Sequence, residues 1–296
     1  MRMNVLTSAR IEIKKHTKQK YSILRKYLKA CLTFEKIYGN FAYIDTHGGS
    51  GKVLFEGQET NGSPLIAAES EAHPQCYAIE IDKDRRLLLR KAVARIPNIK
   101  IIEGDCNKEI DSLLKQIEDW KFTFCFLDPD GLVYYREDKT KVFQLTWPTI
   151  EEISKRNNSE ILVNLQTPGI IRTMGAIAAE PERATKLAED ITALIGNNSW
   201  SSKRTRFELR DLFLDRLQAI GFTFVGAVNV KTEDNTHVYY LVYASHNEIG
   251  AKIMNSNFRI EFGFDPLIEP NLHRFIYDDI AYAKPGIPES TQTTLC

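Results

Sequence analysis

Residues 41–51 read FAYIDTHGGSG, and this stretch decides the fold. A short apolar run ends at Asp45 and is followed by Gly48, Gly49 and Gly51, a pattern that predicts a buried strand running into a tight loop. Glycines there let the backbone approach a ligand without a Cβ clash. The dinucleotide spacing G-x-G-x-x-G and the Walker G-K-[ST] are both absent. We therefore expect a ligand-binding loop of another kind after the first strand.

Similar apolar runs alternate with helical stretches along most of the chain. Strands are expected at 41–45, 76–81, 99–105, 122–128 and 160–166, and a hairpin at 223–230 and 237–245. Alternating strands and helices predict a parallel sheet with helices on both faces. A doubly wound α/β sheet of seven strands, mostly parallel and closed by an antiparallel C-terminal hairpin, resembles the class I methyltransferase sheet.

Composition divides the chain into three parts. Residues 1–40 form a basic helical segment, 41–258 the sheet domain, and 259–296 a C-terminal extension. The stretch from about 167 to 203 is too long for an ordinary connection, so it predicts a helical insertion, which Pro181 interrupts. The basic start has two interpretations: a surface that grips phosphates, or the solvated face of a first helix.

Charge and cysteine usage exclude several classes of protein. The chain has 39 basic and 39 acidic residues, which weakens any expectation of strong nonspecific nucleic-acid binding. Its five cysteines are widely spaced and form no C-x-x-C pair: Cys31, Cys76, Cys106, Cys125 and Cys296. This spacing predicts a reducing compartment, without a disulfide framework, a zinc ribbon or a metal site. No apolar stretch suits a leader or a bilayer span, so we expect a cytoplasmic protein with no membrane partner.

Four strands of the predicted sheet end in an acid. They are Asp45, Glu80, Asp105 and Asp128. The carboxyl ends of parallel strands meet at one sheet edge, where ligands bind. There Asp45 is suited to binding an ammonium or ordering the loop, Glu80 to accepting ribose hydroxyls, and Asp105 to accepting an adenine amino group. The alternative for each acid alone is a solvated strand end or a helix cap.

Several phrases together resemble one known family. YIDTHGGSGKV, NGSPLIAAE, IEIDK, EGDCNKE, FLDPDGL and YYLVYASHNEIG are similar to the three-Cys-motif partner family of methyltransferase-like proteins, over roughly residues 18–258. More distantly, YIDTH is similar to the ribosomal RNA large-subunit adenine-N6 methyltransferases that carry DTHAGAG. The resemblance implies S-adenosylmethionine as cofactor and a three-cysteine-motif protein as partner. The residues it implies for the cofactor are Asp45, His47, Gly48, Gly49, Gly51, Glu80, Asp105 and Cys106.

Asp128-Pro129-Asp130-Gly131 stands where amino-methyltransferases carry (D/N)-P-P-(Y/F). The resemblance implies that Asp128 and the Pro129 carbonyl are the catalytic groups, which accept hydrogen bonds from the target amino nitrogen. The motif's aromatic stacks on a base that has flipped out of its helix, but here that position is glycine. This departure weighs against adenine-N6 chemistry.

Substrate contacts are expected from residues near this motif. Asp130 is one candidate, and Tyr134 or Tyr135 is placed to supply a stacking face, although both are also ordinary loop aromatics. Asn164 lies near the carboxyl end of the fifth strand, at the same sheet edge, where polar residues are common. His47 either contacts substrate or packs beneath the loop with both nitrogens bonded.

A basic group before the first strand has two interpretations. His16, Lys18 and Lys20 either fold back over the site or form a basic helix start, and the second interpretation is favoured.

Three functions fit the sequence. The first is a methyltransferase acting on an exocyclic amino group of RNA or DNA. The second is a non-catalytic or partner-dependent protein that keeps the fold and docks a partner on the insertion. The third is a methyltransferase for a small molecule or a protein. Methyl transfer depends on alignment more than on covalent help, so few residues distinguish these functions.

Overall fold

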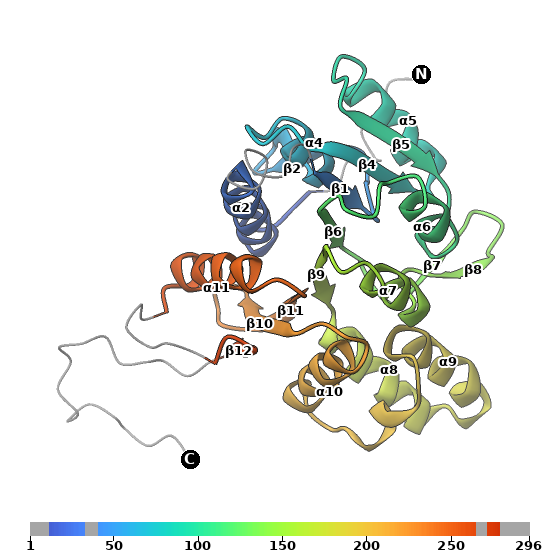
Figure 1. The fold of residues 1–296 in the computed structure, drawn as a ribbon. Helices are drawn as coiled ribbons and strands as arrows, with labels where there is room; N and C mark the ends of the chain where they lie inside the picture. The colour runs from blue at the N-terminus through green and yellow to red at the C-terminus, as the bar shows by residue number, and fades with distance from the viewer. Residues whose placement is uncertain (1–11, 33–40, 265–270, 279–296) are drawn as a thin grey trace.

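The structure is a computed structural model that describes residues 12–32, 41–264 and 271–278. Parts of the expected N-terminal segment and C-terminal extension, and Cys296, lie outside the described residues. An eight-stranded sheet dominates the described part (Figure 1). Its strands, in chain order, are β1 (Ala42–Asp45), β4 (Gln75–Glu80), β5 (Ile99–Glu103), β6 (Thr123–Leu127), β9 (Ser159–Leu165), β10 (Phe224–Lys231), β11 (His237–Ser245) and β12 (Arg274–Tyr277).

The strand order confirms the predicted α/β class. Across the sheet it runs β12-β10-β11-β9-β6-β1-β4-β5, and the five strands from β9 to β5 are parallel. β11 runs antiparallel to both β9 and β10, as the predicted hairpin requires. The order reverses at β1, whose neighbours β4 and β6 lie on its two sides. This reversal is the switch point at which open α/β sheets bind ligands.

The sheet has one strand more than the seven predicted. β12 pairs parallel with β10, with Val225 opposite Arg274 and Val228 opposite Tyr277. A Cβ on Gly226 would lie 2.0 Å from the ring of Phe275, so glycine leaves the space that this ring fills. Four residues near a chain end give too short a pattern to be distinguished from a loop. β10, which would be the edge of a seven-stranded sheet, is therefore covered by β12.

Helices cover both faces of the sheet (Figure 1). Their bounds are α2 (Lys15–Ala30), α4 (Ser63–Ala68), α5 (Lys83–Ala92), α6 (Cys106–Leu114), α7 (Trp147–Ser154), α8 (Thr167–Ala179), α9 (Ala184–Ile195), α10 (Arg206–Ala219) and α11 (Glu248–Phe262). One buried cluster joins residues of α2, α4 and α11 to the sheet, and a second joins residues of α6, α7, α9 and α10. β6 and β9 are buried along their whole length, because both faces are covered.

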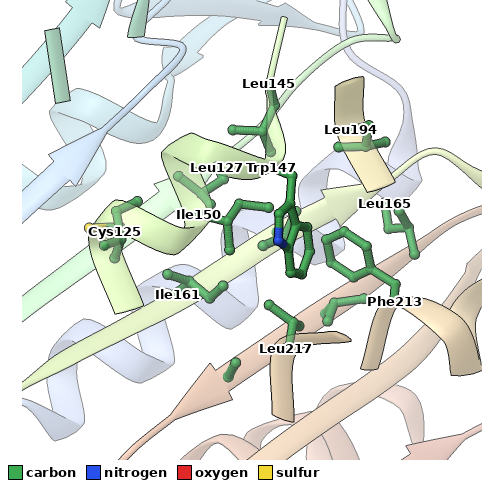
Figure 2. Packing of buried hydrophobic residues seen from close by; sticks show 14 of the residues in the cluster. Cys125, Leu127, Leu145, Trp147, Ile150, Ile161, Leu165, Leu194, Phe213 and Leu217 are labelled. Carbon is green, nitrogen blue, oxygen red and sulfur yellow. The ribbon is translucent and has the colours of Figure 1, made fainter. Parts of the chain in front are cut away.

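The second cluster has Trp147 near its centre (Figure 2). Its ring meets that of Phe213 edge to face at 5.8 Å between centroids. Cys125 from β6 and Ile161 from β9 lie in the same cluster, so helices α7 and α10 pack on the central strands. Cys125 is thus a small core residue. Cys31, Cys76 and Cys106 are also buried free thiols.

Smaller elements complete the described chain. In the 167–203 stretch, α8 and α9 pack against each other around a short 3-10 turn at Pro181–Arg183, and a second such turn spans Ser199–Ser202. Two hairpins were not predicted: β2 (Lys52–Phe55) with β3 (Gln58–Asn61), and β7 (Val133–Tyr135) with β8 (Lys141–Phe143). Within the described ranges, none of the helices combines the length and apolar character needed to span a bilayer.

Candidate cofactor and acceptor cavity

A cavity of about 640 Å³ opens at the carboxyl ends of β1, β4, β5 and β6. This size lies within the usual range for small-molecule sites. Ten of the predicted site residues line it: His47, Gly48, Gly49, Gly51, Glu80, Asp105, Cys106, Asp128, Asp130 and Tyr134. The sheet edge therefore brings together residues that are up to 87 positions apart in the chain, from His47 to Tyr134.

The loop after β1 is shaped by backbone contacts to carboxylates. The backbone N–H of Gly49 donates to Glu80 Oε2 at 2.7 Å, and that of Asp82 donates to Glu80 Oε1 at 2.7 Å. Gly51 has a φ of +77°, and a Cβ there would lie 2.7 Å from Leu65 Cδ1. Glycine is needed because this conformation is strained in other residues. Burial raises the pKa of Glu80, opposed by its bond to the Asp82 N–H.

Asp45 is fully buried and does not line the cavity. Its carboxylate accepts the backbone N–H of His47 at 3.1 Å and the hydroxyl of Tyr43 at 3.2 Å. Burial raises the pKa of Asp45 to about 7, opposed by a hydrogen bond from Ser63. Of the two roles expected for Asp45, the geometry favours ordering the loop.

His47 packs beneath the loop with both ring nitrogens bonded. Nδ1 lies 2.8 Å from the hydroxyl of Thr46, and Nε2 lies 3.0 Å from the carbonyl oxygen of Gln144. A carbonyl only accepts, so Nε2 carries the proton of the neutral ring. Burial lowers the pKa of His47, which keeps the ring neutral. The side chain therefore ties the glycine loop to the segment after β8.

Asp105 and Cys106 begin α6. The Asp105 side chain accepts from the backbone N–H of Asn107 at 3.0 Å, as a helix N-cap does. Cys106 Sγ donates to the Gln144 carbonyl at 3.3 Å, and burial raises the pKa of its thiol. Asp105 both caps α6 and lines the cavity, so its interpretations as a helix cap and as a ligand-binding acid do not exclude each other.

Asp128 is held by two side chains from other elements. Lys20 Nζ on α2 donates to Oδ1 at 2.5 Å and to Oδ2 at 2.6 Å, and Asn164 Nδ2 on β9 donates to Oδ1 at 2.8 Å. Lys20 stands in the basic start of α2, as the favoured interpretation expects, but it also folds over the site, and only 5% of the residue is exposed. His16 and Tyr21 of the same helix also line the cavity, whereas Lys18 is exposed.

Three other predicted residues lie behind or beside the cavity. Pro129 is buried, and its carbonyl oxygen lies 3.5 Å from Asn164 Nδ2. Asn164 Oδ1 is buried and accepts no hydrogen bond from the described residues, so an acceptor beside Asp128 is left unsatisfied. Tyr135 is 60% exposed on the outer side of β7. The structure thus places Asn164 and Tyr135 outside the cavity wall.

Tyr134 and Asp130 border the cavity mouth. The Tyr134 hydroxyl donates to Asp82 Oδ2 at 2.9 Å, and Asp130 lies 3.8 Å from Arg85. Sequence reasoning missed Gln144, whose Oε1 accepts the Asp130 N–H at 2.7 Å and whose carbonyl holds His47 and Cys106. No motif marks Gln144, because only the β7–β8 hairpin brings it to the cavity.

Comparisons with known proteins give similar folds at low sequence identity. No protein-family model matches the chain, and no curated protein matches it. Among solved structures, protein LPL1258 from Legionella pneumophila is 12% identical with a TM-score of 0.49, over 82% of this chain and 92% of that one. Precorrin-6y C5,15-methyltransferase from Geobacter metallireducens is 14% identical with a TM-score of 0.34, over 73% and 86%. EvdMO1 is 11% identical with a TM-score of 0.40, over 76% of this chain and 42% of that longer one.

Proposed function

We propose that the chain is an S-adenosylmethionine-dependent methyltransferase, and that its acceptor is the exocyclic amino group of a nucleic-acid base. The observation that carries the proposal is the cavity itself. Glu80, Asp105 and Asp128 each follow a different parallel strand, and all three line one space beside the glycine loop. This arrangement lies at the switch point, where the fold rule places a ligand.

The residues present fit this cofactor. Each carboxylate oxygen of Glu80 accepts one backbone N–H and keeps a second lone pair, which suits it to ribose hydroxyls. Asp105 accepts through Oδ1 from Asn107, which leaves Oδ2 for an adenine amino group. Gly48 and Gly49 allow close backbone approach. The cofactor, when bound, supplies an electrophilic methyl group.

On the acceptor side, Asp128 has the chemistry to orient an amino nitrogen. Its oxygens already accept N–H groups from Lys20 and Asn164, which supports a role in binding a nitrogen donor. A carboxylate that accepts one N–H turns the nitrogen lone pair away from itself and relieves the positive charge that develops during transfer. Tyr134 lines the same cavity and offers a ring face to a base.

A partner-dependent protein is the second candidate, supported by an ion pair. Lys141 on β8 bridges to Asp190 on α9, so the 167–203 insertion is tied to the hairpin that borders the cavity. Val142, Phe143 and Gln144 line the cavity directly after that bridge. A three-cysteine-motif protein docked on the insertion would therefore act on the site through this hairpin.

Calorimetry with S-adenosylhomocysteine tests the cofactor side first. We expect micromolar binding, about −8 kcal/mol, which Glu80→Ala weakens about 100-fold because two backbone donors and the ribose lose a charged acceptor. Asp84→Ala is the matched control, since Asp84 is an exposed acid in the first turn of α5, four residues after Glu80 and outside the cavity lining. Absence of binding in the folded wild type would reject the cofactor assignment.

Transfer of a labelled methyl group to a single-stranded oligonucleotide containing all four bases tests the acceptor side. Asp128→Asn keeps the shape of the site but removes the charge, and we expect it to reduce transfer at least about 100-fold with cofactor affinity unchanged. Full transfer by this variant would remove Asp128 from the mechanism. Transfer that appears only with a three-cysteine-motif protein present would favour the second candidate.

A further inference from the structure

The ammonium of Lys20 lies in a site formed by a carboxylate and aromatic rings. Both carboxylate oxygens of Asp128 lie within hydrogen-bond distance of its Nζ, at 2.5 and 2.6 Å. The rings of Tyr21, Phe126 and Tyr239 surround the same nitrogen at 5.6–5.8 Å from their centroids. Aromatic faces at this range attract a cation. The ammonium is therefore bound by charge, hydrogen bonds and aromatic rings at once.

This site coincides with the one that the proposed function assigns to the acceptor. An amino acceptor needs a lone pair of Asp128 and the space next to it. Lys20 takes both oxygens, and Asn164 takes a further position on Oδ1. Lys20 and an acceptor nitrogen consequently compete for the same carboxylate. One lone pair of Oδ2 is left, so an acceptor nitrogen gains unhindered access to Asp128 once the Lys20 ammonium has moved.

The part of α2 that carries Lys20 is weakly held. Its N-cap residue, Lys14, makes no capping hydrogen bond, and the first turn contains no acid. Lys15, His16 and Lys18 instead place basic groups at the positive end of the helix dipole, which is unfavourable. Apart from the Lys20–Asp128 pair, residues 15–20 are held by three contacts. Lys15 forms an exposed ion pair with Glu233, the Tyr239 hydroxyl donates to the His16 carbonyl at 3.0 Å, and Lys18 Nζ lies 4.1 Å from the centroid of the Phe55 ring.

The rest of α2 is firmly anchored. Ile23, Leu24, Tyr27 and Leu28 are all completely buried, and the Tyr27 hydroxyl donates to the buried carboxyl of Glu160 on β9. Movement of residues 15–20 therefore does not require the rest of the helix to leave the sheet. The weakly held part of α2 ends at Lys20, and the anchored part begins by Ile23.

We propose that Lys20 is an internal plug of the acceptor site, and that the start of α2, residues 15–20, is the gate that withdraws it. The proposal rests on the proposed function, because it assigns the plugged site to the acceptor. Displacing Lys20 does not leave Asp128 without a partner: Asn164 remains bonded, and the acceptor N–H replaces the ammonium. The released ammonium regains water, which offsets the lost ion pair.

Amine acylation of the full chain tests the plug without cofactor or substrate. A water-soluble N-hydroxysuccinimide acetate is applied, and the labelled lysines are quantified by peptide mass spectrometry. We expect Lys20 to react at least about tenfold more slowly than Lys18, an exposed lysine two residues earlier on the same helix, because Lys20 is only 5% exposed and its ammonium is bonded to Asp128. Asp128→Asn should bring the Lys20 rate close to that of Lys18 and leave Lys26 unchanged. Fast labelling of Lys20 in the wild type, or continued protection in Asp128→Asn, would overturn the plug.

Acceptor affinity tests the gate. With S-adenosylhomocysteine at saturation, Lys20→Met should bind adenosine at least about threefold more tightly than wild type. In the wild type, Lys20 fills the acceptor site in part of the molecules, and the apparent affinity falls in proportion to the fraction of molecules whose site is open. Lys26→Met is the matched control, since it removes an ion pair to Glu261 from the same helix far from the cavity. Equal or weaker binding by Lys20→Met would show that Lys20 assists the acceptor and would overturn the gate.

The two proposals fail in different ways. Loss of S-adenosylhomocysteine binding would reject the cofactor assignment and leave the acylation result unaffected. If adenosine binds to neither protein, the nucleobase acceptor fails, and the acylation rates alone decide whether Lys20 is a plug.

Discussion

The two halves of helix α2 are held in different ways. The half from Lys15 to Lys20 lies over the cavity and is held by polar and cation–π contacts, of which the Lys20–Asp128 pair is the least exposed ion pair. The half from Ile23 to Leu28 is packed into the core and carries a buried hydrogen bond to Glu160. One helix therefore combines a structural part with a part that is free to respond to a ligand, because burial differs along its length.

The largest effect is expected in the buried half. Leu24→Ala should lower the free energy of unfolding by about 3 kcal/mol, since it removes a fully buried side chain and leaves a cavity. Urea unfolding measures this change. Arg25→Ala is the control on the adjacent exposed position and should cost less than about 0.5 kcal/mol. Similar losses for both variants would contradict the division of the helix.

An effect of similar size is expected from pH, through Glu160. Burial raises its pKa to about 7, opposed by hydrogen bonds from Tyr27, Tyr243 and Ser245. The folded protein therefore keeps this proton up to about pH 7, whereas the unfolded chain loses it near the ordinary glutamate value. Stability should fall as pH rises from about 4.5 to about 7, by about 1.4 kcal/mol per pH unit from this group, and level off above.

Glu160→Gln isolates that contribution. Glutamine resembles the protonated carboxyl and does not titrate, so the urea midpoint of the variant should change less between pH 5 and pH 7 than that of wild type. Asp45, whose buried carboxyl also has its pKa raised to about 7, keeps a similar dependence in both proteins. Parallel pH profiles for the two proteins would show that Glu160 does not titrate in this range.

The smallest effect is expected at the exposed start of α2. Lys15→Met breaks the ion pair to Glu233, in which both side chains are about 70% exposed. Exposed pairs contribute little because water screens them, so the urea midpoint should not change measurably. A clear loss of stability would mean that this contact, and not the buried Lys20 pair, holds the first turn in place.

The sequence predicted more of the contacts on the cofactor side of the cavity than on the acceptor side. Glu80, Asp105 and the glycine loop are ordered by backbone N–H groups of nearby strand ends, and the strand-end rule finds such residues without knowing their neighbours. Asp128 was found by the same rule. Its partner Lys20 is 108 residues away, on a helix whose basic character alone predicts a solvated surface.

Some expected site residues were placed elsewhere by packing. Tyr134 and Tyr135 are adjacent in sequence, but the alternation of side chains along β7 puts Tyr134 on the cavity wall and Tyr135 in solvent. Gln144 reached the cavity with no motif, because the β7–β8 hairpin returns the chain to His47. Neither outcome follows from local pattern.

By itself, the sequence determined the doubly wound sheet, the closing antiparallel hairpin and the edge at which the acids gather. These follow from the periodicity of apolar residues and from loop chemistry, which are local properties. Only the tertiary structure decided that β12 extends the sheet, that Asp45 faces the loop instead of the cavity, and that Lys20 fills the site of Asp128. Those features depend on contacts between distant segments, whose energies appear only when the whole chain is packed.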